Sequence, residues 1–155
     1  MTKQNIRIIE TDATHAAIAA PLLDAYRQFY KKPSDLDAAF VFLSERLKNE
    51  ESVLFLAFLD SGSAAKPVGF VHLYPTFSSL TLRKQWILYD LFVAHEARRR
   101  GIGEALMNRA RQLAKETGAD SLILETAKDN FIAQGLYERL GYIRDEVFYR
   151  YSLQI

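Results

Sequence analysis

The chain has 155 residues, 49% of them hydrophobic and 25% charged, which is the balance of a single folded domain and excludes a disordered chain. Its 20 lysines and arginines nearly match its 19 aspartates and glutamates, so the net charge of +1 argues against a general nucleic-acid or membrane-surface binder. The absence of cysteine excludes disulfides, a thiol nucleophile and thiolate metal ligands, and three scattered histidines argue against a histidine metal site.

The N-terminal part is predicted to hold one strand and two helical stretches. Residues 6–9 have strand character, and Asp12 offers an N-cap for a helical stretch that runs to about residue 30. Pro21 lies inside that stretch and predicts a kink or a break there. Ser34 with Asp37 resembles the capping box of the next helix, which would bury Leu36, Phe40, Leu43 and Leu47.

Strands dominate the middle of the chain. Residues 53–59 and 68–74 predict a hairpin joined by the turn-rich connection 60–67. After an irregular polar segment at 75–84, residues 86–93 are rich in aromatic and β-branched residues and predict a third strand.

Helices and strands then alternate to the C-terminus. An amphipathic helix is predicted over 103–117, a strand over 121–126, and a helix over 131–140 that ends at Gly141. Two short strands, near 142–143 and over 147–153, would close the chain. This order predicts a single α/β domain over 1–155, with a mixed sheet that is antiparallel first and has a parallel pair around the helix at 103–117.

The most informative stretch is Arg98-Arg99-Arg100-Gly101-Ile102-Gly103, which lies between a predicted strand and a predicted helix. The first N–H groups of a helix have no partner inside it, and the helix dipole there favours negative charge. The glycines allow close approach to the backbone, and arginines pair with phosphate oxygens. A pyrophosphate is the expected ligand. A Rossmann loop fits poorly because Leu106 occupies the third glycine position, and the Walker ending is missing.

A second motif opens the last predicted helix. Asn130 begins this helix, and Tyr137 follows two turns later on the same face. Because the helix closely follows the strand at 121–126, both motifs are expected at the C-terminal ends of neighbouring parallel strands, where open α/β sheets bind ligands. Ordinary structural roles also exist, since Asn130 is a good N-cap and Tyr137 could simply pack.

Together these residues carry a resemblance to a known family. Arg98-x-x-Gly101-x-Gly103 after a Leu-Phe-Val strand, and the later Asn-x-x-Ala…Leu-Tyr-Glu-Arg-Leu-Gly-Tyr, resemble the GCN5-related N-acetyltransferase (GNAT) superfamily. The stretch 88–93 is most similar to its diamine and thialysine acetyltransferase branch. That branch usually has acids at both 89 and 90, whereas this chain has Tyr89, which weakens the case for a polyamine substrate. The resemblance implies the acyl-CoA N-acyltransferase fold, a mostly antiparallel mixed sheet with a splayed parallel strand pair, flanked by helices.

The resemblance also implies acetyl-CoA as co-substrate, bound where the parallel strands splay, and no metal. The pantetheine arm would pair with the strand backbone, the pyrophosphate would bind the glycine turn, and the last helix would touch the cofactor. The implied acetyl-CoA residues are Leu91, Phe92, Val93, Arg98, Arg99, Arg100, Gly101, Ile102, Gly103, Glu104, Asn130, Phe131, Ala133 and Tyr137.

The implied reaction is direct attack of a primary amine on the thioester in a ternary complex, with Tyr137 as the general acid that protonates the leaving thiolate. The base is open: Asp90 could act directly or through water, Glu125 on the partner strand is the rival, and Asp90 could equally only attract a cationic substrate. The expected substrate residues are Tyr30, Tyr89, Asp90 and Glu125. A wider aromatic and acidic set, which could also be core, is Tyr26, Phe29, Tyr74, Phe77, Trp86, Asp24, Asp35 and Asp37.

The predicted function is therefore N-acetylation of a small-molecule amine. Two alternatives stay open: a catalytically silent CoA-binding or regulatory module, and an enzyme that acts on a protein or peptide amine. We expect no nucleic-acid or membrane partner, and a homodimer is left open by analogy with relatives. Because the first residues lack a signal peptide's apolar core and no apolar run reaches membrane-spanning length, a cytoplasmic location is expected.

Overall fold

The computed structural model describes residues 5–60 and 65–155, and the chain divides into two compact units, Met1–Glu125 and Thr126–Ile155. Part of the predicted connection at 60–67 lies outside the described residues. The second unit contains one helix, α4 (Phe131–Arg139). The elements of the first unit are β1 (Ile6–Glu10), a 3₁₀ turn (Ala13–His15), α1 (Ala16–Phe29), α2 (Leu36–Lys48), β2 (Val53–Leu59), β3 (Gly69–Ser78), β4 (Arg83–Val93), a second 3₁₀ turn (His95–Ala97), α3 (Ile102–Glu116) and β5 (Ser121–Leu124).

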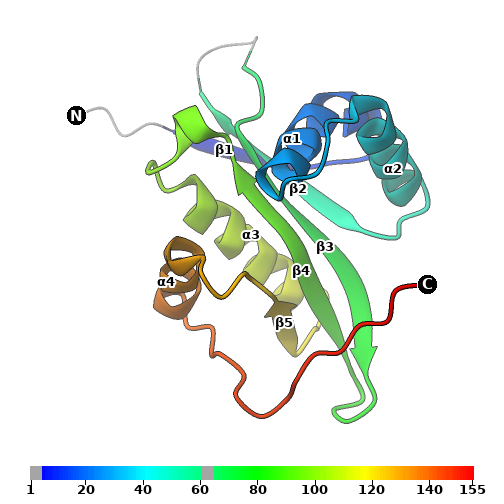
Figure 1. Cartoon of the computed structure of the whole chain (residues 1–155), viewed down its shortest axis with the longest axis vertical. Helices are drawn as coiled ribbons and strands as arrows, with labels where there is room; N and C mark the ends of the chain where they lie inside the picture. Colours follow the sequence, from blue (N-terminus) through cyan, green and yellow to red (C-terminus); the bar gives the residue numbers. More distant parts are fainter. Residues whose placement is uncertain (1–4, 61–64) are drawn as a thin grey trace. The chain divides into compact units, whose positions relative to one another are not determined.

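The described strands form one sheet in the order β1-β2-β3-β4-β5 (Figure 1). Neighbouring strands are antiparallel except for β4 and β5, which are parallel, so the predicted α/β fold with a mostly antiparallel mixed sheet is confirmed. Successive side chains of a strand point to opposite faces. One face packs against α1 and α2 through Leu54, Leu56 and Phe70. The other packs against α3, where Gly69 lies close to Ile102 and Leu106.

Strand β4 changes its surroundings halfway along. Opposite β3, His72 pairs with Asp90 and Leu73 pairs with Leu88, so Tyr89 is the extra residue of a β-bulge. On the other side, β5 pairs only with Gln85–Leu88. From Tyr89 to Val93, β4 therefore has no strand beside it on the β5 side within the described residues. This is the splayed parallel pair that the resemblance implies.

Two predicted irregularities are wrong. The segment 75–84 is not irregular, because β3 continues to Ser78 and β4 begins at Arg83 in one long hairpin. Pro75 is tolerated in β3 because pairing with β2 ends at Leu73, which leaves β3 with a neighbour on one side only. Helix α1 also runs through Pro21 without a break. The buried alanines that precede Pro21, which are Ala16, Ala19 and Ala20, pack this turn against the core despite the lost hydrogen bond.

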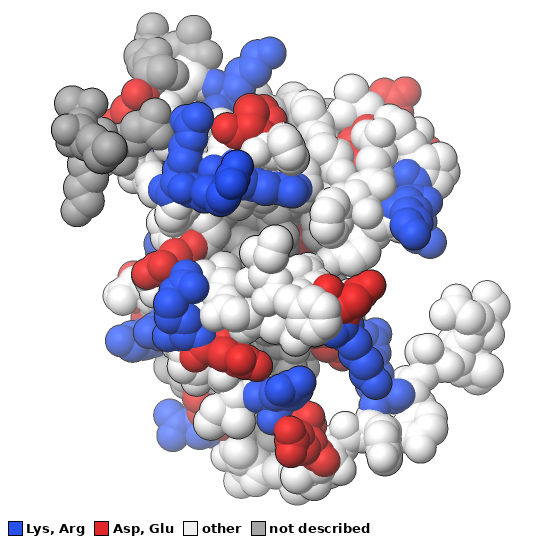
Figure 2. Space-filling model, turned by 60° about the vertical axis from the view of Figure 1, so that its left-hand side comes forward, with Lys and Arg blue, Asp and Glu red and all other residues white. Residues whose placement is uncertain are grey.

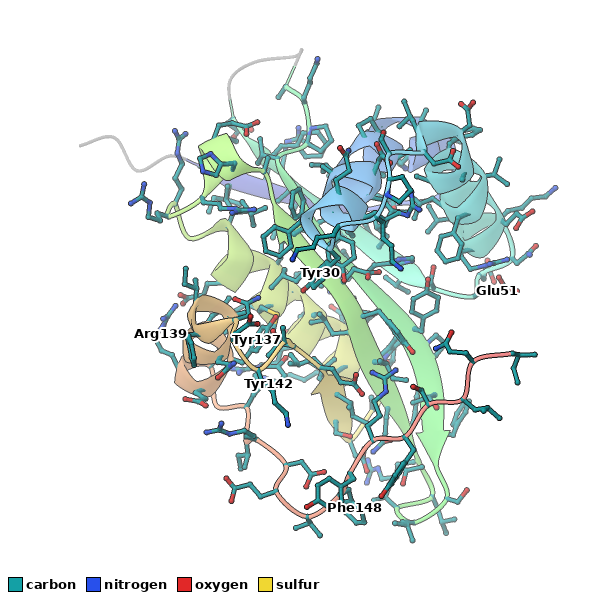
Figure 3. All side chains as sticks on the ribbon, viewed as in Figure 1. Tyr30, Glu51, Tyr137, Arg139, Tyr142 and Phe148 are labelled. Carbon is teal, nitrogen blue, oxygen red and sulfur yellow. The ribbon has the colours of Figure 1, made fainter. Side chains whose placement is uncertain are left out.

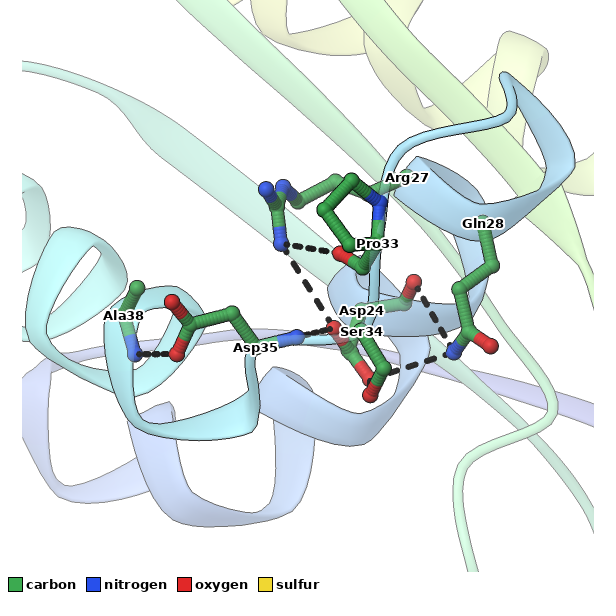
Figure 4. Close-up of polar contacts among 7 residues, drawn as sticks. All are labelled: Asp24, Arg27, Gln28, Pro33, Ser34, Asp35 and Ala38. Carbon is green, nitrogen blue, oxygen red and sulfur yellow. Dashed lines mark hydrogen bonds and ion pairs between the residues drawn. The ribbon is translucent and has the colours of Figure 1, made fainter.

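Helix α2 begins one residue later than the predicted capping box suggests. Its N-cap is Asp35, whose carboxylate accepts a hydrogen bond from the Ala38 N–H at 3.0 Å. The Ser34 hydroxyl instead donates to the Asp24 carboxylate of α1 at 2.6 Å (Figure 4). The buried face of α2 also differs from the predicted one. Leu43 and Leu47 are buried as predicted, but Leu36 and Phe40 are exposed, and Ala39 is buried instead.

The predicted closing strands at 142–143 and 147–153 are absent from the second unit, where residues 142–155 are irregular. The Asp145 carboxylate accepts from the Val147 N–H at 2.8 Å and from the Phe148 N–H at 3.3 Å, which folds this segment into a turn. A strand also needs a neighbour to satisfy its backbone, and the described residues provide none here. In the part of the chain that the structure describes, no helix is both long and apolar enough to cross a membrane.

Candidate active site

The turn after β4 has the backbone of an anion site. Gly101 is the N-cap of α3 with φ +80°, and Arg99 has φ +61°. Two residues with positive φ, separated by one residue, therefore lie just before the helix. Such alternation turns successive N–H groups toward one concave side. The first bond of the helix runs from the Ala105 N–H to the Gly101 carbonyl at 3.0 Å, which leaves the preceding amides without a helical acceptor. The predicted phosphate-binding geometry fits this backbone.

Arg98 has a different role from its two neighbours. Its Nε donates to the Val93 carbonyl at 2.9 Å, and its guanidinium lies 5.7 Å from the ring centres of both Phe29 and Phe92. This side chain therefore ties the end of β4 to the end of α1. Arg99 and Arg100 are exposed. On the face seen in Figure 2, basic side chains gather in a band near the top of the view, and the two signs are interspersed below it.

The open edge of β4 fits an extended ligand with amide groups. The strand continues five residues beyond Leu88, where β5 pairing stops, and carries the half-buried residues Leu91, Phe92 and Val93. In an antiparallel ladder, every second residue directs its N–H and C=O away from the partner strand. Since β3 occupies one side of β4, those groups face the β5 side and can pair with a pantetheine arm. The residues present therefore fit acetyl-CoA at both its arm and its phosphates.

A groove of about 710 Å³ opens on the α1–α2 face of the same strand. Predicted substrate residues Tyr89 and Asp90 line this groove, but Tyr30 and Glu125 do not. Tyr30 stacks edge-on against Tyr26 and Phe29 at the end of α1 (Figure 3). Glu125 is an exposed residue that follows β5. The lining residues are Leu23, Tyr26, Arg27, Ala38, Ala39, Phe42, Arg46, Tyr74, Tyr89 and Asp90.

Charges of both signs line the groove. The Asp90 carboxylate lies 3.4 Å from Nδ1 of the buried His72. Arg27 lies 3.6 Å from the Asp24 carboxylate, and Arg46 is paired with Glu51. Burial, reinforced by the nearby Asp90 charge, raises the pKa of Tyr74, so its hydroxyl stays protonated and can donate a hydrogen bond to a ligand.

The sequence pattern singled out neither the buried His72 nor six of the residues that line the groove. The six come from α1 and α2, where each has an ordinary place in an amphipathic helix pattern; they are Leu23, Arg27, Ala38, Ala39, Phe42 and Arg46. His72 gives the one usable signal, because a titratable residue in the middle of an apolar strand must find polar partners when it is buried.

In the second unit, α4 has the predicted local structure. Asn130 is its N-cap and accepts from the Ala133 N–H at 3.3 Å, while Gly141 has φ +92° just past the end. Tyr137 is half-buried, with its ring 6.0 Å from that of Tyr142, and the two are labelled in Figure 3. Capping accounts for Asn130 without a ligand, and Phe131 is largely exposed.

Comparison with known proteins identifies the family. Residues 19–142 match the model of the acetyltransferase (GNAT) family. The chain is 43% identical over 151 residues to YhfO, an uncharacterized N-acetyltransferase of Bacillus subtilis (strain 168), covering 97% of each chain. It is 30% identical over 126 residues to a probable acetyltransferase of Haemophilus influenzae, covering 81% and 84%.

A solved structure agrees with this assignment. The crystal structure of a probable acetyltransferase superposes with a TM-score of 0.88 at 41% identity, covering 96% of this chain and 97% of that one. The fold is therefore that of an acyltransferase enzyme. The chain belongs to the acetyltransferase (GNAT) family, whose members use acetyl-CoA.

Proposed function

We propose that this enzyme transfers the acetyl group of acetyl-CoA to the primary amine of a small molecule held in the groove beside Asp90. One observation carries the proposal: Asp90 lines the groove and also belongs to the stretch of β4, from Tyr89 to Val93, that has an open edge on the β5 side. Acceptor and donor sites thus meet on a single strand. A groove of about 710 Å³ also falls within the size of sites that enclose small ligands.

The chain's residues bind and orient the cofactor through three segments. Acetyl-CoA, when bound, supplies the activated acetyl thioester. Leu91–Val93 pair with its pantetheine arm, and the backbone from Arg99 to Glu104 receives its pyrophosphate at the start of α3. Arg98 holds the end of β4 in place through the Val93 carbonyl. The start of α4, with Asn130, Phe131 and Ala133, contacts the cofactor as the family resemblance implies.

The amine nitrogen loses two protons during the reaction, and the leaving sulfur gains one. An alkylammonium has an ordinary pKa of about 10.4 and must lose its first proton before its nitrogen can attack. Asp90 accepts this proton, directly or through water, and is better placed than Glu125 because only Asp90 lines the groove. The Tyr137 hydroxyl gives a proton to the departing sulfur and is restored by the second proton, which the nitrogen loses as the amide forms. Tyr89 and the two groove arginines favour an amine that is not a polycation, which argues against the polyamine side of the diamine branch.

The competing functions have less support. A silent CoA-binding module does not require an acceptor groove with a half-buried carboxylate in it. The groove volume of about 710 Å³ matches sites that enclose small molecules, which favours a small-molecule amine over a peptide. We further propose that residues 1–155 act as one domain, since the family match at 19–142 includes parts of both units. A cytoplasmic location and a homodimer stay predictions.

The test is thiol release from acetyl-CoA over a panel of amines. The panel contains polyamines, amino acids, thialysine, aminoglycosides and short peptides, and pairs each amino acid with its amide because Arg27 and Arg46 line the groove. We expect turnover with one small-molecule class, reduced about 10²-fold or more by Tyr137→Phe. Tyr142→Phe, the neighbouring ring in the same unit, is the matched control and should cost far less. Turnover with peptides alone, or none at all, would contradict the proposal.

A further inference from the structure

A buried polar chain leads from the groove into the core. His72 is 0% exposed and lies on β3 directly opposite Asp90 of β4. Its Nε2 is 2.7 Å from the hydroxyl oxygen of Ser52, which is itself buried at the start of β2. Its Nδ1 is 3.4 Å from Oδ2 of Asp90. Of these three side chains, that of Asp90 lines the groove, so a ligand in the groove can contact Asp90, which in turn lies next to His72.

The two ends of the His72 ring have different surroundings. Nε2 has a hydrogen-bond partner, whereas Nδ1 makes no hydrogen bond among the described residues. In the tautomer that the inference requires, the ring hydrogen is on Nε2 and donates to Ser52, and Nδ1 carries a lone pair. This lone pair faces the lone pairs of the Asp90 carboxylate, and two facing acceptors are satisfied when one proton lies between them. A buried polar atom without a partner is costly, so the geometry favours uptake of a proton here.

We propose that His72 is a positioning residue that acts through Asp90, so that the Asp90–His72 pair, rather than Asp90 alone, receives the proton of the substrate amine. This inference rests on the proposed function, in which the amine lies beside Asp90. The N–H bond of the ammonium breaks, its electron pair stays on nitrogen, and an O–H bond forms on Asp90. That proton moves on to Nδ1, which restores the carboxylate beside an imidazolium. After turnover the proton returns through Asp90 to solvent.

The pair solves a mismatch in proton affinity. Aspartate side chains ordinarily have a pKa of about 3.9 and histidine side chains about 6.5, against about 10.4 for an alkylammonium. Transfer to a carboxylate alone is therefore uphill by about 6.5 pH units, and transfer to an imidazole by about 4. A general base works best when its pKa lies near the pH at which the enzyme operates, and the ordinary pKa of imidazole is closer to neutral pH than that of a carboxylate. A carboxylate backed by imidazole keeps its negative charge to attract the ammonium while offering the higher affinity.

Other charged and titratable groups surround the pair from each packed element. The Tyr74 ring lies 4.8 Å from that of His72, and the Tyr89 ring lies 5.3 Å from that of Tyr74. Tyr26 donates to the Tyr89 carbonyl at 3.5 Å. From the helix side come the paired groups Arg27 with Asp24, and Arg46 with Glu51 and Glu45. These ion pairs largely cancel, which leaves Asp90 as the charge that faces His72 most closely.

The first test is the pH profile of kcat/KM for the best amine of the panel. Glutamine at position 72 can donate a hydrogen bond to Asp90 but cannot accept the proton. For His72→Gln we expect the maximum of kcat/KM to be about 10- to 10²-fold lower. We also expect the fall of kcat/KM on the acid side of the profile to begin more than about one pH unit lower. His15→Gln, which changes a histidine at the start of the chain, should leave both unchanged. A loss of rate with an unmoved acid limb would show a purely structural role and overturn the proposal.

The second test needs neither acetyl-CoA nor an amine. The chain has three histidines, so side-chain ¹⁵N NMR can follow each through a pH titration, with His72→Gln and His15→Gln assigning the signals. We expect the ring-nitrogen signals of His72 to change in Asp90→Asn, whereas those of His15 stay as in the parent. If His72 does not respond to Asp90→Asn, the proposal is wrong. If no amine is acetylated, the proposed function fails, and this titration still decides whether the pair shares a proton.

Discussion

The glycine turn at Arg98–Gly103 and the groove at Asp90 adjoin the same half of β4, but they are built in opposite ways. The turn consists of six consecutive residues, and its proposed role depends on backbone N–H groups fixed by the positive φ values of Arg99 and Gly101. The groove draws its lining from α1, α2, β3 and β4, and its proposed role depends on side chains. One site is local in sequence, and the other exists only after folding.

The difference determines what each site tolerates. Amides at a helix N-terminus are present whatever the side chains are, so a substitution in the turn should matter only if it changes the backbone or removes a charge. In the groove, Asp90 has no substitute nearby, because Asp24, Glu45 and Glu51 are each paired with an arginine. We therefore expect large effects from single groove residues and graded effects from the turn.

The largest expected effect is that of Asp90→Asn. The amide keeps the size of the side chain but cannot take the amine's proton, so kcat/KM should fall about 10³-fold, within the usual range for a general base. Calorimetry should show CoA affinity within about twofold of the parent, since Asp90 faces the groove and not the open edge of β4. If kcat/KM falls by less than tenfold, Asp90 only attracts the substrate. The groove would then tolerate single substitutions as well as the turn does.

Asp24→Asn tests how the groove is held together, at a residue that does not line it. The hydroxyl of Ser34 and then the Asp35 N–H hold the pKa of Asp24 below its ordinary value, and these bonds join α1 to α2 (Figure 4). Loss of the charge should destabilise the fold by about 2 kcal/mol at pH 7, because a nearly buried, charge-assisted network loses its acceptor.

The pH dependence of that loss has a definite sign. The folded pKa of Asp24 is lowered, so its stabilisation is complete above the ordinary value of 3.8 and disappears as the pH falls through the folded pKa. Urea unfolding at pH 7 and at pH 3 should show the gap between Asp24→Asn and the parent shrinking at the lower pH. The exposed Asp37→Asn is the control and should change little at either pH. A gap that is constant with pH would contradict the charged network.

The same contrast explains what the sequence allowed us to predict. The turn was predictable because glycine spacing, a preceding apolar strand and an amphipathic helix are all local signals, and the order of elements from β1 to α4 followed from such patterns. The cap of α2 was not, because the Ser34 hydroxyl donates to the Asp24 carboxylate, ten residues earlier, and Asp35 accepts from the helix N–H instead. The hairpin around Pro75 was missed because the cost of proline depends on which strand lies beside it.

The candidate site was predicted in the same uneven way. Asp90 and Tyr89, which share β4 with the motif, line the groove, whereas Arg27 and Arg46 reach it from helices whose packing no local pattern fixes. Tyr30 does not line the groove, because its ring packs edge-on against that of Tyr26, one helical turn earlier, which does line it. Spacing places a residue on a helix face but does not show what that face meets.

In the turn, Arg99→Gln should have a moderate effect that depends on the ligand. Removing one exposed charge from the phosphate site should weaken acetyl-CoA binding about 10-fold, the scale of one charge-assisted hydrogen bond. Acetyl-pantetheine, which lacks the pyrophosphate, should bind the variant and the parent equally in calorimetry. An equal loss for both ligands would contradict a phosphate contact, because acetyl-pantetheine has no pyrophosphate for Arg99 to bind.

The smallest expected effect is that of Gly101→Ala. A Cβ built on Gly101 comes no closer than 4.0 Å to Ile6 Cδ1 among the atoms outside its chain neighbours, so the substitution meets no steric obstacle. What remains is the cost of holding a residue with a side chain at φ +80°, about 1 kcal/mol in the free energy of unfolding. Urea unfolding measures this cost directly.

Gly135→Ala is the matched control, since it makes the same change inside α4, where a Cβ also meets nothing within 4 Å but φ is helical. Alanine should stabilise there by about 0.5–1 kcal/mol, so the two variants should move in opposite directions. If Gly101→Ala proves neutral, the turn is not held in the left-handed conformation in solution. The concave row of amides would then form only around the pyrophosphate, and the turn, like the groove, would owe its shape to contacts beyond its own residues.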